Sequence, residues 1–161
     1  MVPALRAWRG YLETPPNRTV FAEMISSRGG PDLQGLPWCV TFVFAVHPGA
    51  RRLGAPCAGI RGLLRRLFLR GRLRGRAWHP RAGDLVFLRN DPAGGPEHVE
   101  ILLETDGEYL VSIGGNARDP SRRFPPGYGG AVDIRCRDAQ DPKILGFGKL
   151  HDLKGVGQNE F

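Results

Sequence analysis

The stretch Leu36-Pro37-Trp38-Cys39-Val40-Thr41-Phe42-Val43 is the one on which the expected fold depends. Proline suits the first turn of a helix, and residues 38–46 stay apolar until His47-Pro48-Gly49 ends the run. We therefore predict a helix from Pro37, with Cys39 just inside its start. Unpaired N–H groups and the positive end of the helix dipole stabilise a thiolate there. A cysteine in an apolar helix is also commonly a small buried hydrophobe.

Around this helix, the sequence predicts a further helix before it and short strands after it. Residues 4–13 are predicted to form a helix that buries Leu5, Trp8 and Leu12. The clearest hairpin signal is Asp106-Gly107, a dipeptide typical of a two-residue turn. Helices followed by strands predict an α+β fold, with N-terminal helices packed on an antiparallel sheet. The predicted strands are 84–89, 99–105, 108–113, 131–136 and 144–150.

The length of 161 residues fits one domain, which we place at residues 1–150, followed by a mobile tail at 151–161. Three cysteines are too few for a disulfide framework. The cysteines and the four histidines show no close ligand spacing, so we expect no metal and no cofactor. No apolar run is long enough to cross a membrane. Arg6 and Arg9 interrupt the N-terminus, so we expect synthesis in the cytoplasm without a signal peptide.

The formal net charge of +7 comes from one segment of the chain. Nine of the 20 arginines lie in residues 51–76, a segment without Asp or Glu, and the rest of the chain has 14 basic and 16 acidic residues. The segment does not alternate with aromatic side chains that would stack on bases, which disfavours nucleic acid as a partner. We treat residues 51–76 as a cationic insert in a nearly neutral domain.

Within this Arg-rich segment, apolar residues recur at helical spacing, with arginines between them. One interpretation is a surface helix that buries the apolar stripe and leaves the arginines in water. The other is a docking face for a polyanion, which would be nucleic acid, anionic lipid or an acidic wall polymer. The apolar residues are Leu63, Leu64, Leu67 and Phe68, and the candidate polyanion-binding residues are Arg61, Arg65, Arg66 and Arg70.

A reactive thiolate needs a proton acceptor, and imidazole is its usual partner. His98 is the best candidate, because it opens the first strand of the predicted hairpin and its side chain is held rigidly. A two-residue turn would pair His98 with Gly115 and place Asn116 diagonally opposite. Strict alternation puts Asn116 on the wrong face, and a bulge at Gly114-Gly115 would correct this.

Five short motifs together indicate a resemblance to a known family. They are Pro37-Trp38-Cys39 with Phe42-Val43, then Pro80-Arg81-Ala82-Gly83-Asp84-Leu85-Val86-Phe87, His98-Val99-Glu100-Ile101, Gly115-Asn116, and Ile144-Leu145-Gly146-Phe147. In this order, over about residues 4–150, the chain resembles the CHAP domain, the cysteine- and histidine-dependent amidohydrolase/peptidase of bacterial and phage cell-wall enzymes. The resemblance implies a papain-like cysteine peptidase fold.

By the same resemblance, Cys39 is the nucleophile, His98 the general base and Asn116 the residue that orients His98. The backbone N–H of Cys39 supplies part of an oxyanion hole. We assign Trp38, Glu100 and Gly115 to substrate binding. The chain departs from the family at Gly114, where many members have Glu, and at Glu100, where the family usually has Gly. The Glu100 carboxylate either crowds the cleft or binds a cationic substrate group.

The expected function is hydrolysis of a peptidoglycan amide bond, by an amidase or an endopeptidase. A phage lysin or a delivered antibacterial toxin fits, acting on the wall or periplasm after lysis or specialised secretion. Its partners would be peptidoglycan and either an immunity or inhibitor protein or a delivery partner. The alternatives are a non-catalytic wall-binding module on the same fold, and an anionic-polymer or nucleic-acid binder acting through the Arg-rich segment.

Overall fold

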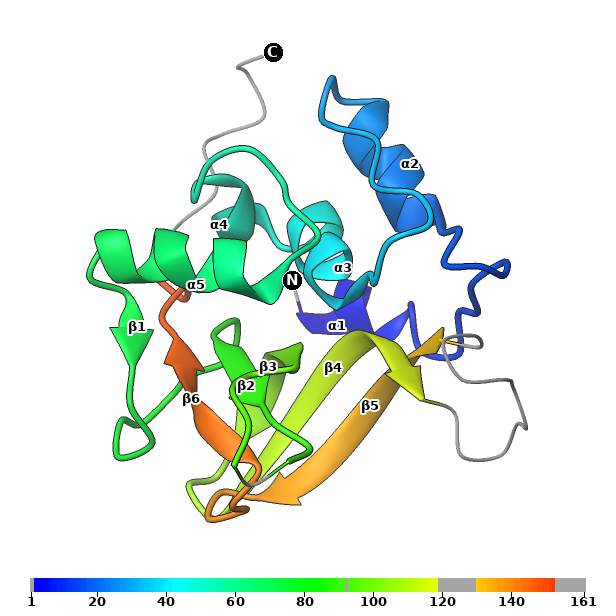
Figure 1. The fold of residues 1–161 in the computed structure, drawn as a ribbon. Helices are drawn as coiled ribbons and strands as arrows, with labels where there is room; N and C mark the ends of the chain where they lie inside the picture. Colours follow the sequence, from blue (N-terminus) through cyan, green and yellow to red (C-terminus); the bar gives the residue numbers. More distant parts are fainter. Residues whose placement is uncertain (1, 92, 119–129, 153–161) are drawn as a thin grey trace.

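The computed structural model describes residues 2–91, 93–118 and 130–152. All helices in this part of the chain precede all strands, as predicted. Figure 1 shows the helices gathered over one side of a strongly twisted sheet. The helices are α1 (Val2–Arg6), α2 (Val20–Ser26), α3 (Cys39–Val46), α4 (Pro48–Arg51) and α5 (Ile60–Leu69). The strands are β1 (Leu73–Arg74), β2 (Leu85–Leu88), β3 (His98–Thr105), β4 (Tyr109–Arg118), β5 (Gly130–Asp138) and β6 (Ile144–Gly148).

The six strands form one sheet in the order β1-β6-β2-β3-β4-β5, and all neighbours are antiparallel. Strand β6 follows β5 along the chain but returns to lie between β1 and β2. Each of the five predicted strand runs contains a strand, and β1 is an additional one. The predicted α+β class, with N-terminal helices on an antiparallel sheet, is confirmed.

The predicted helix after Pro37 is present as α3, with Trp38 as its N-cap. Every residue from Cys39 to Ala45 is buried, because this short helix lies between α2 and strands β3 and β4. Its first turn packs on β4 at Gly115, where an added Cβ would lie 2.5 Å from the Trp38 ring and 2.6 Å from Phe42 Cβ. Glycine at this position therefore allows the close approach of α3 to the sheet.

The N-terminal prediction is wrong in its boundaries. Helix α1 ends at Arg6, and Leu12, expected in the same helix, instead bridges to Ala131 at the start of β5. Helix α2 was not predicted, although Thr19 caps it by accepting a hydrogen bond from the N–H of Ala22. A threonine before apolar residues at helical spacing is the signal that marks this helix.

The predicted hairpin of β3 and β4 is present in a different register. Thr105 pairs with Leu110 rather than with Glu108. The carboxylate of Asp106 accepts hydrogen bonds from the backbone N–H groups of Glu108 and Tyr109, which widens the connection beyond a two-residue turn. An aspartate that caps the backbone in this way competes with the expected turn type.

The Arg-rich segment is integrated into the domain. Helix α5 buries Leu63 and Leu67 completely, and β1 adds to the edge of the sheet beside β6. The predicted apolar stripe is confirmed for these two leucines, but Phe68 is 70% exposed. The helix ends before Gly71, whose φ of +60° no other residue type adopts as readily.

The four candidate polyanion-binding arginines of this helix do not share one environment. Arg61, Arg65 and Arg70 are exposed. Arg66 is half-buried, with its guanidinium 5.5 Å from the centre of the Phe44 ring and a hydrogen bond of 3.2 Å to Cys57 Sγ. Arg66 therefore contributes to packing, while the other three face solvent.

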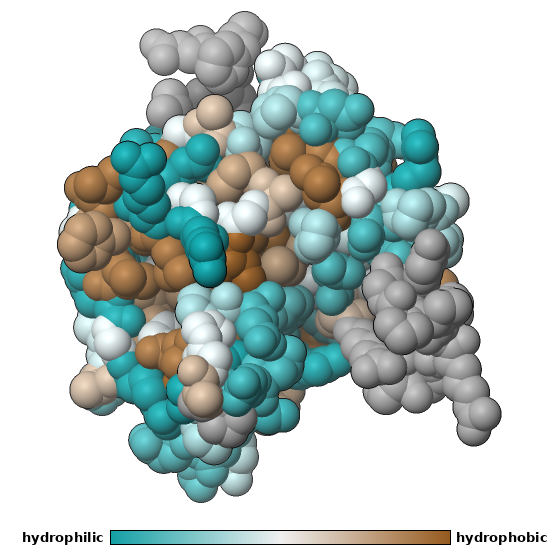
Figure 2. Space-filling view, in the orientation of Figure 1, coloured by the Kyte–Doolittle hydropathy of each residue, from teal (hydrophilic) through white to brown (hydrophobic). Residues whose placement is uncertain are grey.

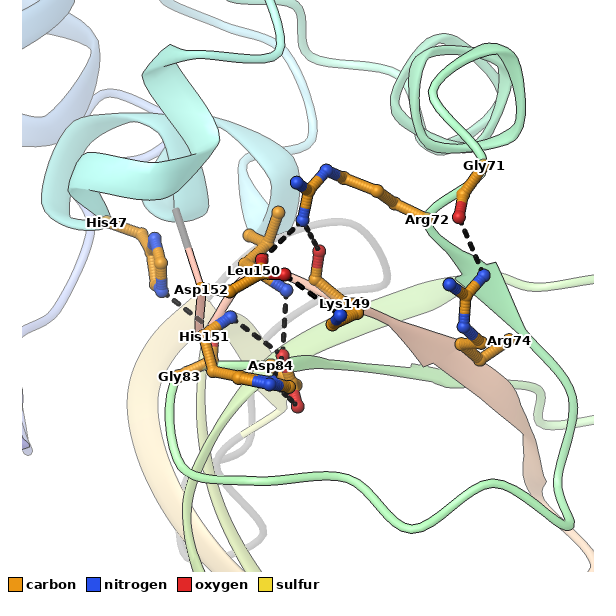
Figure 3. Close-up of polar contacts among 10 residues, drawn as sticks. All are labelled: His47, Gly71, Arg72, Arg74, Gly83, Asp84, Lys149, Leu150, His151 and Asp152. Carbon is orange, nitrogen blue, oxygen red and sulfur yellow. Dashed lines mark hydrogen bonds and ion pairs between the residues drawn. The ribbon is translucent and has the colours of Figure 1, made fainter. Parts of the chain in front are cut away.

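A buried carboxylate ties the chain after β6 to the start of β2 (Figure 3). Asp84 is fully buried, and its Oδ1 accepts hydrogen bonds from the backbone N–H groups of Leu150 and His151. The Nδ1 atom of His151 lies 2.9 Å from both carboxylate oxygens. His151, which we expected in the mobile tail, is thus held by the domain, and residues 153–161 of that tail lie outside the described residues.

His47 is buried at the junction of α3 and α4, where it serves the fold. Its Nδ1 accepts hydrogen bonds from the N–H groups of Gly49 and Ala50, so the proton resides on Nε2, which donates to the Gly83 carbonyl at 2.8 Å (Figure 3). Burial lowers the pKa of His47 from 6.5 to about 4, because desolvation of the charged ring outweighs the hydrogen bond to Gly83.

We expect this histidine to make the protein sensitive to acid. The unfolded chain takes up the His47 proton near pH 6.5 and the folded chain only near pH 4, so the stabilisation is present above pH 6.5 and is lost as the pH falls through 4. His47 alone should lower the free energy of unfolding by about 3 kcal/mol over this range. Urea denaturation at several pH values measures the effect. His47→Gln, which keeps a donor for Gly83, should show a shallower pH dependence, and equal slopes would contradict the assignment.

Candidate active site

The start of α3 is held in place by Trp38. This side chain is completely buried, and its indole Nε1 donates a hydrogen bond of 2.6 Å to the Glu13 carboxylate. The ring stacks on Phe21 with a centroid separation of 5.6 Å. Cys39, the first residue of the helix, is 5% exposed. Its backbone N–H is one of those that an α-helix leaves without an intrahelical acceptor. The start of the helix therefore places the thiol and this N–H donor next to each other.

The structure brings the predicted pair together. His98 is the first residue of β3, and its side chain lines the same cleft as Cys39, close enough for the sulfur to raise the pKa of the imidazole. The imidazole is 20% exposed, so solvent reaches the pair from one side. Thiol and imidazole come from elements that are distant in sequence and meet because α3 packs on β3 and β4.

A buried carboxylate lies behind the imidazole. Glu100 is 1% exposed, and its Oε1 is 3.4 Å from His98 Nε2. Arg137 holds the carboxylate with two hydrogen bonds, from Nη1 at 2.6 Å and from Nη2 at 2.8 Å, and the hydroxyl of Ser112 donates a third at 2.6 Å. Two parallel bonds from one guanidinium fix the position of a carboxylate as well as its charge. Glu100 is therefore a rigid, ionised neighbour of His98.

These contacts shift the protonation of both groups. Burial lowers the pKa of His98, but its interactions with the nearby Cys39 sulfur and the Glu100 carboxylate outweigh burial and raise the pKa to about 9. Burial raises the pKa of Glu100, but the hydrogen bonds from His98 and Arg137 and their positive charges outweigh it and lower the pKa to about 2. At neutral pH the site therefore favours an imidazolium beside a carboxylate.

Glu100 occupies the space that a side chain at position 114 would fill. An added Cβ on Gly114 would lie 2.7 Å from Glu100 Cγ and 3.0 Å from His98 Nε2. The two departures from the CHAP pattern that the sequence shows are thus neighbours in space. Glycine at 114, on the adjacent strand β4, leaves room for the glutamate, which lies on β3 two residues beyond His98.

Asn116 lies in the same cleft but is placed differently from the prediction. The β4–β5 register shifts between Gly114 and Ala117, close to the predicted bulge, and Asn116 itself has a φ of +58°. The carboxamide oxygen lies against Gly130, where an added Cβ would be 2.4 Å away. Among the candidate residues, Glu100 is the one whose carboxylate lies 3.4 Å from His98 Nε2.

Cys39, His98 and Asn116 line an open cleft of about 770 Å³. The cleft continues past the ends of β2 and β6 and along β5, so a chain-like molecule could extend away from the thiol. Four of the six Asp, Glu, Lys and Arg side chains on its walls are basic, and two of these four, Arg137 and Arg135, are paired with Glu100 and Asp133. The charged residues of the lining are Arg89, Glu97, Arg135, Arg137, Asp141 and Lys143.

The three residues assigned to substrate binding are placed behind the cleft rather than on its wall. Trp38 is 0% exposed and Glu100 is 1% exposed, and Gly115 is buried beneath the first turn of α3. Trp38 contacts Glu13 and Phe21, and Glu100 contacts Arg137, Ser112 and His98.

Arg137 and Ser112 complete the site, and no sequence signal marked them. Arg137 lies on β5, 37 residues beyond Glu100, and reaches it across β4, which carries Ser112. This contact forms because β3, β4 and β5 are neighbours in this order in the sheet. Within the described ranges, no group of three or more His, Cys, Asp or Glu side chains is arranged to hold a metal ion.

Comparison of the chain with protein-family models, with curated proteins and with solved structures finds no match.

We expect the imidazole of His98 to stay protonated through neutral pH and to lose its proton near pH 9. In Glu100→Gln the negative charge disappears, so the pKa should fall toward the ordinary 6.5. An NMR titration of the His98 ring measures both values. Glu104→Gln, at an exposed glutamate on the same strand, is the matched control and should leave the titration unchanged. Circular dichroism verifies that each variant is folded, and an unshifted His98 titration in folded Glu100→Gln would contradict the role of the carboxylate.

Proposed function

We propose that this protein is a cysteine amidohydrolase that cleaves an amide bond of peptidoglycan. The observation that carries the proposal is that Cys39, at a helix start, and His98 line one open cleft, with the ionised Glu100 carboxylate 3.4 Å from the imidazole. A thiolate, a proton carrier and a group that orients the carrier are the parts that nucleophilic amide hydrolysis needs. The resemblance of the sequence to the CHAP domain supplies the substrate class.

In the proposed reaction, the Cys39 thiolate attacks the amide carbonyl carbon and a C–S bond forms. The charge that develops on the carbonyl oxygen is stabilised by the backbone N–H of Cys39 and the positive end of the α3 dipole. The His98 imidazolium then gives its proton to the departing amine, the C–N bond breaks and a thioester remains. Water attacks the thioester and transfers a proton to His98, and the carboxylic acid product leaves with Cys39 restored as a thiolate.

A papain-like fold is part of the same proposal. It is supported by a nucleophile at the start of a buried helix, packed on an antiparallel sheet that provides the histidine. We further propose that the enzyme reaches the cell wall or periplasm after lysis or by specialised secretion. An immunity protein, an inhibitor or a delivery partner would then accompany it.

The first test is cleavage of purified peptidoglycan from several wall types, with released fragments identified by mass spectrometry. The wild-type protein should release fragments with a new carboxyl and a new amine end, and Cys39→Ala should release none. Cys136→Ala is the matched control, because Cys136 is an exposed thiol in the same cleft and should be dispensable. The absence of any Cys39-dependent fragment would overturn the enzymatic proposal and favour a non-catalytic wall-binding module.

The second test moves the carboxylate to the position that the family resemblance gives it. Glu100→Gly removes the group that orients His98 and should lower kcat/KM by roughly 100-fold or more. Gly114→Glu alone should also be impaired, because its side chain meets Glu100 and His98. The double variant Glu100→Gly/Gly114→Glu should recover activity by at least roughly tenfold over Glu100→Gly, together with a raised His98 pKa. A double variant no better than the worse single one would contradict a carboxylate that can act from either strand.

A further inference from the structure

The outer face of α5 combines basic and apolar side chains that the fold does not use. An α-helix turns 100° per residue, so the buried Leu63 and Leu67 define one side of α5. Arg61, Arg65 and Leu69 recur every four residues on the opposite side, and Phe68 follows Arg61 by seven residues, within the same arc. Phe68 is 70% and Leu69 is 66% exposed, which is far above what a helix packed on its own domain needs.

The apolar part of this face continues onto the neighbouring strand. The chain turns at Gly71 and enters β1, where Leu73 is 36% exposed. Figure 2 shows apolar side chains gathered at the left of the molecule, over the end of α5 and β1, beside hydrophilic ones. We call this face the α5–β1 surface, and its residues are Arg61, Arg65, Phe68, Leu69 and Leu73. It is apolar at one end and cationic at the other.

The charge around this surface has one sign. Residues 51–76 contain nine arginines and no acidic residue. Arg72 is the member of this set that makes an ion pair within the described part of the chain, with Asp152. Arg61, Arg65 and Arg70 are exposed. A partner of this surface must therefore supply negative charge and, next to it, an apolar region.

We infer that the α5–β1 surface docks on an anionic lipid bilayer. A bilayer interface offers phosphate groups and hydrocarbon within a few ångströms of each other, which matches arginines beside exposed Phe and Leu side chains. A soluble polyanion would pair with the arginines but would leave Leu69 and Leu73 in water, since aliphatic side chains do not stack on bases. The apolar end of the surface thus favours lipid over nucleic acid or an acidic wall polymer.

The dimensions of α5 suit attachment at the interface. Its ten residues are about 15 Å long, and no helix among the described residues is long and apolar enough to cross a bilayer. The helix therefore lies on the membrane, with Phe68 and Leu69 entering the headgroup layer at its C-terminal end. Arg61 and Arg65, on the same side of the helix, contact lipid phosphates.

Cosedimentation of the full chain with vesicles tests this inference and needs no substrate. Vesicles of phosphatidylcholine with about 30 mol% phosphatidylglycerol should bind the protein, and vesicles of phosphatidylcholine alone should bind it at least about tenfold more weakly. Raising the salt concentration should weaken binding without abolishing it, because the apolar contacts are not screened. Absence of binding to the anionic vesicles, or equal binding to both kinds, overturns the inference.

Variants assign the binding to this surface. Phe68→Ser/Leu69→Ser should weaken vesicle binding by at least about tenfold, and Arg61→Gln and Arg65→Gln by about fivefold each. Leu36→Ser is the matched control, because Leu36 is 43% exposed and lies outside this surface. These positions are exposed, so the variants should keep the wild-type circular dichroism. Vesicle binding indifferent to Phe68→Ser/Leu69→Ser, with a salt-sensitive gel shift of single-stranded DNA lost in the arginine variants, would overturn the lipid assignment in favour of nucleic acid.

Discussion

The close packing of the first turn of α3 on β4 is the constraint on which the rest of the site depends. Gly115 has no side chain, and any Cβ there would overlap the Trp38 ring and Phe42. Trp38 in turn is fixed by its hydrogen bond to Glu13 and its stacking on Phe21. The helix start therefore has one position relative to the sheet, and a thiol placed there meets the imidazole that begins β3. In a close-packed interior, the position of one element fixes the positions of the elements packed against it.

The electrostatics of the cleft depend on a carboxylate that is buried and hydrogen-bonded within the domain. Glu100 is surrounded by Arg137, Ser112 and His98, and its burial leaves it no contact with solvent or substrate. A buried charge is tolerated when it is paired and fully hydrogen-bonded. The carboxylate then favours the charged form of the imidazole. The sequence left this glutamate as an obstruction or a substrate ligand; the structure buries it beside His98, and we propose that it positions the imidazole.

The elements that could be predicted from the sequence are those with strong local signals. The helix after Pro37 and the strands that flank Asp106-Gly107 combine clear periodicity with clear ends, and they are confirmed. The register of the hairpin was wrong because the Asp106 side chain bonds the backbone and opens the turn. The exposure of Phe68 also contradicted the pattern, because periodicity says which residues share a helix face and not how far the neighbouring elements cover it.

The sequence by itself determined the α+β order of elements and the candidate pair of Cys39 and His98, because helix starts and strand starts are encoded by residues close together in the chain. Only the tertiary structure decided which side chains hold the Glu100 carboxylate beside the imidazole. Glu100, Ser112 and Arg137 come from three adjacent strands, and their meeting depends on strand order and register. Asn116 follows the predicted bulge in the sequence. At the β4 irregularity, however, its carboxamide oxygen lies against Gly130. His98 and Glu100 lie two residues apart on β3, so alternation places them on one face of the strand. Pairing of β3 with β4 and of β4 with β5, which local sequence does not encode, brings Ser112 and Arg137 to hold the carboxylate there.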